Sequence, residues 1–431
     1  MNAVIQPGRL CGTAAVPPSK SAAHRAVLCA ALAAGTSHIG NLEFSQDILA
    51  TLGAVQQLGA KVERGEHDLT ITGRGGAEGF PTVTRPVFCN ESGSTLRFLV
   101  PVFSLTAQKV RFTGAGRLME RPQEIYAQLF ERQGLRFEQN AQGITIFGRL
   151  CPGAFTLPGN VSSQFISGLL FAAPLMEADS TIEVRAPFES RSYVDLTVDA
   201  MQRFGVKVTA RSRKDGTAVY KVAAPQRYTA ADLTVEGDYS QAAFLAVLGS
   251  IVGDVSVSGL EPASRQGDRV ILDILKRCGA KYEAKGGTVS FHRSLLKATE
   301  IDLADCPDLG PVLIALGCFC NGATVIRHAG RLRIKESDRI ASMQEELAKM
   351  GGCVQADGDT VTVTGGALHK PQVPLAGHND HRVVMSMAVA ALAAGVPVTI
   401  EGANAVNKSW PGFFEVLKNL GACVETEETE G

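Results

Sequence analysis

The sequence contains no uninterrupted apolar stretch of the ~18 residues that a membrane-spanning helix requires. Its N-terminal segment lacks a basic region followed by an apolar one, so we expect no secretory signal peptide. Neither sign of charge is in excess, because 42 Lys and Arg stand against 43 Asp and Glu. Non-specific nucleic-acid binding is therefore not expected. These absences predict a cytoplasmic protein with neither a membrane nor a nucleic-acid partner.

Several chemical signatures are also missing. The ten cysteines include no C-x-x-C pair, and no His-x-x-x-His near Cys318 and Cys320 completes a zinc site. No G-x-G-x-x-G opens a helix after a strand, and G-x-x-x-x-G-K-[ST] and G-x-S-x-G are absent. His378 and His381 flank Asp380 at i, i+3 spacing, but no further ligand stands near them in the sequence. We therefore expect neither a metal nor a cofactor, and a reducing compartment for the thiols.

What is present is an ordinary water-soluble composition with a repeat. The 431 residues, 45% of them apolar, suggest two or three domains at ~150 residues each. A helix-like segment, a glycine and alternating residues recur six times, at 58–73, 133–148, 204–222, 278–292, 350–366 and 420–431. The aligned glycines are 69 to 75 residues apart, namely Gly59, Gly134, Gly205, Gly279, Gly352 and Gly421.

Each copy is accompanied by a helix that is apolar on nearly every face. These segments are expected to be buried, and they span 21–35, 94–105, 162–176, 240–251, 307–320 and 381–395. The pattern predicts a strand–helix–strand–helix–strand–strand unit repeated six times, in two groups of three. Domain boundaries near 17–20 and 235–238 would place the N-terminal segment in the same domain as the three C-terminal repeats.

Cations and hydroxyl groups recur at the predicted helix starts. Such starts favour anions because free N–H groups point outward there. Ser and Thr could instead be simple N-caps, and single Arg side chains could lie on solvated faces. That alternative weakens when six cations take equivalent corners, namely Lys20, Arg121, Lys335, Arg339, Arg382 and Lys408. We therefore favour the interpretation that these residues form a binding site for several anionic groups.

At these residues the sequence resembles the enolpyruvyl transferases, and among them the EPSP synthase family. The matching stretches run in the family's order from 17 to 413 and include PPSKSAAHRA (17–26), ESGSTLRF (91–98), VSSQFISGLL (161–170), RIKESDR (333–339), NDHR (379–382) and VNKSWPGF (406–413). The resemblance implies an α/β fold, a two-domain inside-out α/β barrel with three βαβαββ repeats per domain. It further implies domains at 1–18 plus 237–431 and at 19–236, an active site in the cleft between them, and a monomer.

The resemblance also implies a reaction and roles for individual residues. The enolpyruvyl group of phosphoenolpyruvate would pass to the 5-hydroxyl of shikimate 3-phosphate, with release of phosphate. Asp308 would be the base and Glu336 the acid, and Lys20 and Lys408 would stabilise the intermediate. Shikimate 3-phosphate would be held by Lys20, Ser21, Arg25, Ser162, Ser163, Gln164, Ser190, Tyr193, Asp308 and Lys335. Phosphoenolpyruvate would be held by Lys20, Gly93, Arg121, Gln164, Arg339, Arg382 and Lys408.

The charges agree with this assignment, since seven cations would face two substrates that carry about −5 to −6 together. Gly93 would leave room for a ligand on its helix start. Two residues depart from the common family pattern, Glu91 where many members have Asn, and Arg331 where an Asn can contact the substrate phosphate.

Three alternatives stay open at this point. Asp308 could be an ordinary helix cap, and Glu336 a solvated ion pair with Arg339. The chain could be a UDP-N-acetylglucosamine 1-carboxyvinyltransferase, although that family typically has a Cys in the loop that here reads GAGRLMER (114–121). It could also be a non-catalytic anion-binding module on the same scaffold.

Overall fold

The computed structural model describes residues 1–428, so the last three residues of the sixth repeat copy, 429–431, lie outside it. The chain forms two compact units, one of Met1–Ser19 together with the chain from Glu236 onward, the other of Lys20–Val235. Within the described residues, no helix has both the length and the apolarity needed to cross a bilayer.

The unit at Lys20–Val235 contains three repeats. The first comprises α1 (Lys20–Leu32), β3 (Ala34–Gly40), α2 (Gln46–Gln57), β4 (Lys61–Arg64), β5 (Asp68–Arg74) and β14 (Leu233–Thr234). The second comprises β6 (Val87–Phe88), α3 (Gly93–Ser104), β7 (Val110–Thr113), α4 (Glu124–Arg132), β8 (Arg136–Asn140) and β9 (Gly143–Phe147). The third comprises β10 (Ala154–Pro158), α5 (Ser163–Ala172), β11 (Ser180–Arg185), α6 (Arg191–Arg203), β12 (Thr209–Ser212) and β13 (Ala218–Val222).

The other unit contains three repeats of the same kind. The first comprises β2 (Gly12–Ala15), α7 (Tyr239–Val252), β15 (Val255–Ser258), α8 (Ile271–Arg277), β16 (Lys281–Lys285) and β17 (Thr288–His292). The second comprises β18 (Glu300–Asp302), α9 (Gly310–Gly317), β19 (Ala323–Arg327), α10 (Arg339–Lys349), β20 (Cys353–Asp357) and β21 (Thr360–Thr364). The third comprises β22 (Leu375–Ala376), α11 (His381–Ala394), β23 (Val398–Glu401), α12 (Phe413–Asn419), β24 (Cys423–Glu427) and β1 (Asn2–Gln6).

Each repeat builds one open, four-stranded sheet with the same strand order. In the third repeat of the Lys20–Val235 unit, β10 and β11 pair in parallel, β13 runs antiparallel to β11, and β12 lies at the far edge. The other five sheets follow this order among the described residues. The predicted α/β architecture of repeated strand–helix–strand–helix–strand–strand units is therefore confirmed, and residues 1–428 form six separate sheets rather than one closed barrel.

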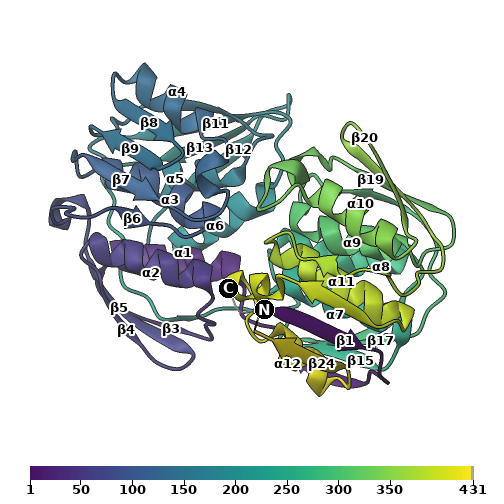
Figure 1. Ribbon diagram of the computed structural model, residues 1–431. Coiled ribbons are helices and arrows are strands. Elements are labelled where there is room, and N and C mark those ends of the chain that lie inside the picture. The colour runs from purple at the N-terminus through teal and green to yellow at the C-terminus, as the bar shows by residue number, and fades with distance from the viewer. Residues whose placement is uncertain (429–431) are drawn as a thin grey trace. The chain divides into compact units, whose positions relative to one another are not determined.

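The apolar helices lie inside and the sheets outside. Helices α7, α9 and α11 pack side by side, with sheets on their outer side (Figure 1), and their residues are almost all buried. In the other unit α3 packs on α5, and α1 packs on β5. The amphipathic helices have one polar face, as in α10, where the exposed positions alternate with buried Ile340, Met343 and Leu347.

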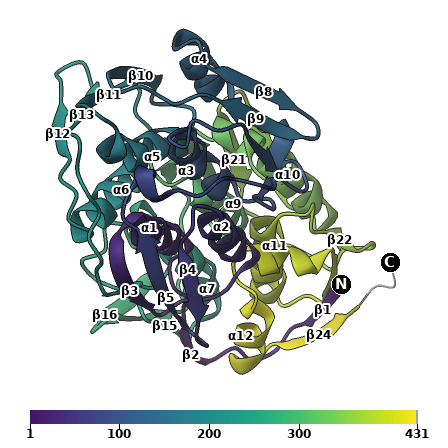
Figure 2. The ribbon, with the colours of Figure 1, turned by 90° about the vertical axis from the view of Figure 1, so that its left-hand side faces the viewer.

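The ends of the chain complete sheets that begin elsewhere in the sequence. Strand β1 lies between β23 and β24, as Figure 2 shows for β1 and β24 near the two termini. Strand β2 pairs in parallel with β15, and β14 pairs in parallel with β3. The N-terminal segment therefore supplies strands to the C-terminal repeats.

The structure corrects two details of the sequence pattern. In the fifth copy the glycine with left-handed backbone is Gly351, at φ +85°, and the alignment on Gly352 is wrong by one residue. The first apolar helix ends at Leu32 rather than at residue 35, because Ala34 already pairs with Arg74 in the sheet.

We predict that helix α11 depends on the left-handed backbone of its C-terminal Gly395. Gly395 has φ +68° and open space around an added Cβ, so Gly395→Ala meets only backbone strain. We expect a loss of about 1 kcal/mol in the free energy of unfolding, measured with urea. Gly366 also has open space but lacks a positive φ, so Gly366→Ala should be neutral or slightly stabilising. Equal losses in both variants would contradict this account.

Candidate active site

The carboxylate of Asp308 joins the starts of three helices. It lies in the short 3-10 segment Pro307–Leu309 before α9. Its Oδ1 accepts from Lys335 Nζ at 3.2 Å and lies 3.4 Å from Arg339 Nη1, and its Oδ2 accepts from Arg382 Nη2 at 3.1 Å. Arg382 also donates to the Asp308 carbonyl at 2.9 Å. Three cations that follow Asp308 by 27, 31 and 74 residues in the sequence thus share its carboxylate.

Arg339 is the most deeply buried of these cations, with only 1% of its side chain exposed. Its Nε donates to Asp380 Oδ2 at 2.8 Å, and its Nη2 donates to Glu336 Oε2 at 2.8 Å. Although burial opposes the charge on both groups, the pair raises the pKa of Arg339 and lowers the pKa of Asp380. Both side chains are therefore charged at neutral pH.

Asp380 has a second task, since it caps α11. Its Oδ1 accepts from the backbone N–H of Arg382 at 2.9 Å, and its Oδ2 also accepts from Ser337 Oγ at 3.1 Å. One carboxylate therefore fixes the start of α11, the start of α10 and the segment before α10. Sequence reasoning did not name Asp380 as a site residue, although it lies in the NDHR stretch (379–382) that resembles the family.

Lys335 and Lys408 differ in surroundings. Burial lowers the pKa of Lys335, against the opposing effect of Asp308, so that its proton is held less firmly than in water. Lys408 ends the 3-10 segment Ala403–Lys408 and donates from Nζ to the carbonyl of Asn379 at 2.6 Å. Asn379 follows His378 in the loop before α11, and both have left-handed backbone, at φ 51° and 49°.

In the Lys20–Val235 unit the predicted residues also begin helices. Lys20 is the first residue of α1 and forms an ion pair with Asp47 of α2 at 2.7 Å. Arg25 donates to Thr197 Oγ1 at 2.8 Å and to the carbonyls of Ser21 and Tyr193 at 2.6 and 2.7 Å. Burial lowers the pKa of Arg25 to about 10, which leaves it charged at neutral pH.

Gly93 lies against the guanidinium of Arg121. A Cβ added at Gly93 would stand 2.9 Å from Arg121 Nη1, so the glycine lets that guanidinium rest on the start of α3. The sequence argument expected the missing side chain to make room for a ligand, whereas in the structure it makes room for the guanidinium of Arg121. Ser92 caps the same helix, accepting from Thr95 N at 3.1 Å.

Gln164 is oriented by two partners from α3. It accepts from Arg97 Nη1 at 2.9 Å through Oε1 and donates to Ser94 Oγ at 3.0 Å through Nε2. Ser162 caps α5 by accepting from the Gln164 backbone N–H, and Ser163 is the first residue of that helix. Arg97 is a further cation beside the predicted residues, and the ESGSTLRF stretch that contains it was its only signal in the sequence.

Ser190 and Tyr193 stand at the start of α6. Ser190 has left-handed backbone, at φ 53°, directly before the helix. Tyr193 presents its carbonyl to Arg25, which ties α6 to α1. The two departures from the family pattern also have defined surroundings, because Glu91 lies against Gly116 and Arg331 donates to the Ala304 carbonyl at 2.5 Å.

The structure thus gathers the predicted residues into two sets. One unit brings together Lys335, Glu336, Arg339, Asp308, Arg382 and, through Asn379, Lys408. The other holds Lys20, Ser21, Arg25, Gly93, Arg121, Ser162, Ser163, Gln164, Ser190 and Tyr193 at the starts of α1, α3, α5 and α6, or beside them.

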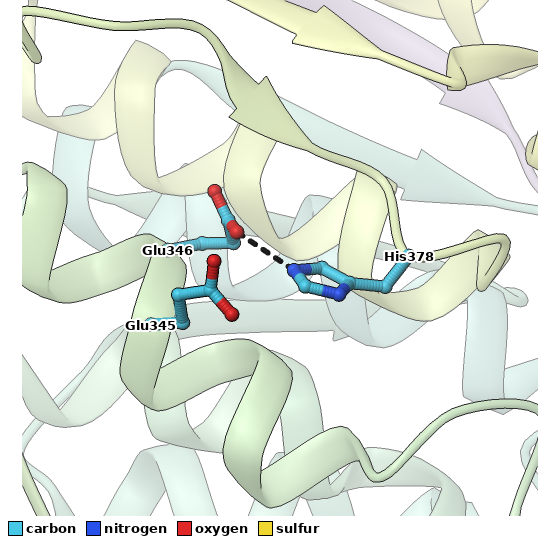
Figure 3. A group of neighbouring side chains, drawn as sticks. All are labelled: Glu345, Glu346 and His378. Atoms are coloured by element: carbon cyan, nitrogen blue, oxygen red, sulfur yellow. Dashed lines mark hydrogen bonds and ion pairs between the residues drawn. The ribbon is translucent and has the colours of Figure 1, made fainter.

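The expected surroundings of His378 are corrected. The sequence placed His381 beside it and no further ligand, whereas the structure places Glu345 and Glu346 of α10 there (Figure 3). His378 Nε2 lies 2.7 Å from Glu346 Oε1, and His381 is buried at the start of α11. Lys349 Nζ lies 2.9 Å from both oxygens of Glu346, so an ammonium already balances this carboxylate. That the protein needs no metal remains a prediction.

Comparisons with known proteins agree on one family. The sequence model of the EPSP synthase (3-phosphoshikimate 1-carboxyvinyltransferase) family matches residues 4–417. A protein of that name from Clostridium kluyveri is 40% identical over 429 residues, which are 98% of this chain and 97% of the relative. Another from Clostridioides difficile is 39% identical, with 98% of each chain covered. The solved EPSP synthase of Acinetobacter baumannii is 26% identical, with a TM-score of 0.76 and 99% and 100% of the two chains covered.

We predict that the Arg339–Asp380 pair is a large contributor to stability. Asp380→Asn keeps the shape but leaves a buried guanidinium short of negative charge, so we expect a loss of about 3 kcal/mol in the free energy of unfolding at pH 7. Because the folded-state pKa of Asp380 is lowered, its contribution is present above the unfolded value of about 4 and fades as the pH falls through the folded value.

Urea unfolding of both proteins at pH 7 and near pH 3 measures this difference. The gap between wild type and variant should narrow in acid. Asp357→Asn, on the exposed edge strand β20, is the control and should change the free energy by less than about 0.5 kcal/mol. If the difference in unfolding free energy between wild type and Asp380→Asn stayed constant with pH, the assignment of a charged Asp380 would be contradicted.

Proposed function

Because the chain belongs to the EPSP synthase family, we propose how its residues transfer the enolpyruvyl group of phosphoenolpyruvate to shikimate 3-phosphate. The observation that carries the proposal is the Asp308 carboxylate, which three cations share beside Glu336. Family membership favours shikimate 3-phosphate over UDP-N-acetylglucosamine as acceptor, and an enzyme over a non-catalytic anion-binding module.

The reaction needs one base and one acid. The 5-hydroxyl of the acceptor must lose its proton as its oxygen bonds to C2 of phosphoenolpyruvate, and the methylene carbon must gain a proton. In the following elimination the methyl group loses a proton and phosphate departs, which restores the double bond. Asp308 is the proposed base and Glu336 the proposed acid, because a positioned carboxyl group can serve either step.

The ion pairs of Asp308 suggest how substrate binding prepares the base. Lys335, Arg339 and Arg382 stabilise its charged form and so weaken its hold on a proton. Anionic groups of the substrates would draw these cations away from Asp308. With its counterions engaged elsewhere, the carboxylate becomes a stronger base when the hydroxyl arrives. The same cations then stabilise the charge that develops on the departing phosphate.

The Lys20–Val235 unit contributes the remaining groups. Arg25, Ser162, Ser163, Gln164, Ser190 and Tyr193 would hold shikimate 3-phosphate, with Lys20, Ser21, Asp308 and Lys335. Gly93, Arg121 and Gln164 would hold phosphoenolpyruvate, with Lys20, Arg339, Arg382 and Lys408. Arg121 suits a carboxylate or phosphate because its planar fork donates two parallel hydrogen bonds. Lys20 and Lys408 would stabilise the tetrahedral intermediate.

Since each unit carries only part of this set, the proposal includes an active site in a cleft between them that closes on the substrates. The chain passes from one unit to the other at 19–20 and at 235–236, and these crossings would be the hinges. We also propose a cytoplasmic monomer without nucleic-acid or membrane partners, in keeping with the ten free thiols and the net charge of −1.

We expect phosphate release from phosphoenolpyruvate with shikimate 3-phosphate as acceptor and none with UDP-N-acetylglucosamine. Glu336→Gln keeps the side-chain shape but cannot supply a proton, so kcat should fall by about 10² to 10⁴. Asp308→Ala should lower kcat by a similar factor and raise KM somewhat, because Asp308 also contacts substrate. Arg121→Ala should mainly raise KM for phosphoenolpyruvate.

Single-turnover experiments separate the chemical step from product release. The exposed Glu345 serves as control, and Glu345→Gln should retain wild-type turnover. Near-normal single-turnover rates in Glu336→Gln would reject it as the acid and leave Lys20 or Lys408 as the candidate. Turnover with UDP-N-acetylglucosamine alone would reject the proposed acceptor.

We predict that saturating shikimate 3-phosphate reduces the radius of gyration measured by small-angle X-ray scattering, and that adding glyphosate reduces it further. The expected cause is neutralisation of like-charged cations contributed by both units. Shikimate without its phosphate is the control and should have a much smaller effect. A radius that does not change under saturating ligand would count against closure.

A further inference from the structure

The loop between β22 and α11 carries two contacts of the proposed site. It consists of residues 377–380, and the carbonyl of Asn379 accepts from Lys408 while the carboxylate of Asp380 accepts from Arg339. His378 and Asn379 both have φ near +50°, a region that costs residues with side chains some free energy even though Asn and His adopt it more often than most. Contacts with the rest of the structure are therefore needed to keep the two residues in this conformation.

The Glu346 carboxylate makes hydrogen bonds with the residues on both sides of Gly377. Its Oε1 lies 2.7 Å from His378 Nε2, and its Oε2 accepts from the backbone N–H of Ala376 at 2.9 Å. The Glu346 side chain is fully buried, and Figure 3 shows it facing the His378 ring from α10. Its charge is balanced by Lys349 of the same helix, at 2.9 Å from each oxygen.

Helix α10 is thereby tied to the loop at two places. Arg339 at its start binds Asp380, and Glu346, seven residues and two turns further on, binds His378. Residues on one face of the helix thus hold both ends of the strained stretch. Because Lys349 already occupies the carboxylate, the arrangement is a link between protein segments rather than a cation site.

We propose that Glu346 and His378 are positioning residues, which hold loop 377–380 so that Asn379 presents its carbonyl to Lys408 and Asp380 its carboxylate to Arg339. The inference rests on the proposed function, in which Lys408 and Arg339 bind phosphoenolpyruvate. It predicts that the link sets the affinity for phosphoenolpyruvate and the rate, and that it affects shikimate 3-phosphate much less.

The charged groups around His378 are Glu346, Glu345 and Lys349, all from α10. The hydrogen bond that His378 donates to Glu346, together with the negative charges of Glu346 and Glu345, raises the pKa of His378, against burial and the Lys349 charge. The ionic form of the link is thus fully present below the ordinary His value of about 6.5 and is lost as the pH rises through the higher folded value.

The test compares His378→Gln and Glu346→Gln with wild type and with Glu345→Gln. In the first two variants we expect KM for phosphoenolpyruvate to rise about tenfold and kcat to fall, because a small misplacement of binding groups is costly. KM for shikimate 3-phosphate should change less than about threefold. Glu345→Gln, one residue away and exposed, should behave as wild type.

The pH dependence of kcat/KM for phosphoenolpyruvate provides a readout that a loss of stability alone would not change. Wild type and Glu345→Gln should both show an alkaline loss that His378→Gln lacks, at somewhat lower pH in Glu345→Gln because one negative charge beside His378 is removed. The inference is overturned if both link variants keep kcat and this KM within twofold of wild type. It is also overturned if they lose only kcat together with melting temperature, since the link would then be purely structural.

Two measures separate this inference from the proposed function and from misfolding. If wild type and Glu345→Gln do not turn over shikimate 3-phosphate, the result contradicts the proposed function rather than the positioning role of Glu346 and His378. Should Glu346→Gln not fold, the half-buried His378→Gln decides the question by the same criteria.

Discussion

A guanidinium that is almost completely buried needs a negative charge beside it, and Asp380 supplies that charge to Arg339 from the start of a different helix. The pair brings together the beginnings of α10 and α11, since Asp380 also caps α11 and accepts from Ser337. Glu336 and Asp308 reach the same guanidinium from two further positions. The geometry of the proposed acid and base therefore follows from the demand of one buried cation for counterions.

The need of each cation for a negatively charged or polar partner also explains why carboxylates lie among the cations of the proposed anion-binding site. Lys20 has Asp47, Lys335 has Asp308, and Lys408 has a backbone carbonyl. Cations placed side by side without such partners would repel one another and destabilise the fold. In the proposed mechanism the phosphate and carboxylate groups of the substrates replace these partners, so the carboxylates that hold the cations in place become available for proton transfer.

The repeat could be predicted in detail, because it depends on local rules. A left-handed glycine after each amphipathic helix, alternating strand residues and helices that are apolar all round each leave a mark in the sequence. The error of one residue at Gly351 and Gly352 arose where two adjacent glycines made the local signal ambiguous. The extra length given to the first helix arose because the alanine-rich stretch continues through Ala33 and Ala34, where alanine fits either the end of a helix or the start of a strand.

The sequence by itself determined the α/β repeat, its helix starts and, through short stretches that resemble one family, the candidate residues at those starts. Only the tertiary structure decided the partners. Residue spacing could not show that Asp380 pairs with Arg339, or that Gly93 leaves room for Arg121. Nor could it show that the partner of His378 is Glu346 and not His381. These contacts join residues from separate helices, and their formation depends on how buried surfaces pack and on which charges burial forces to find a counterion.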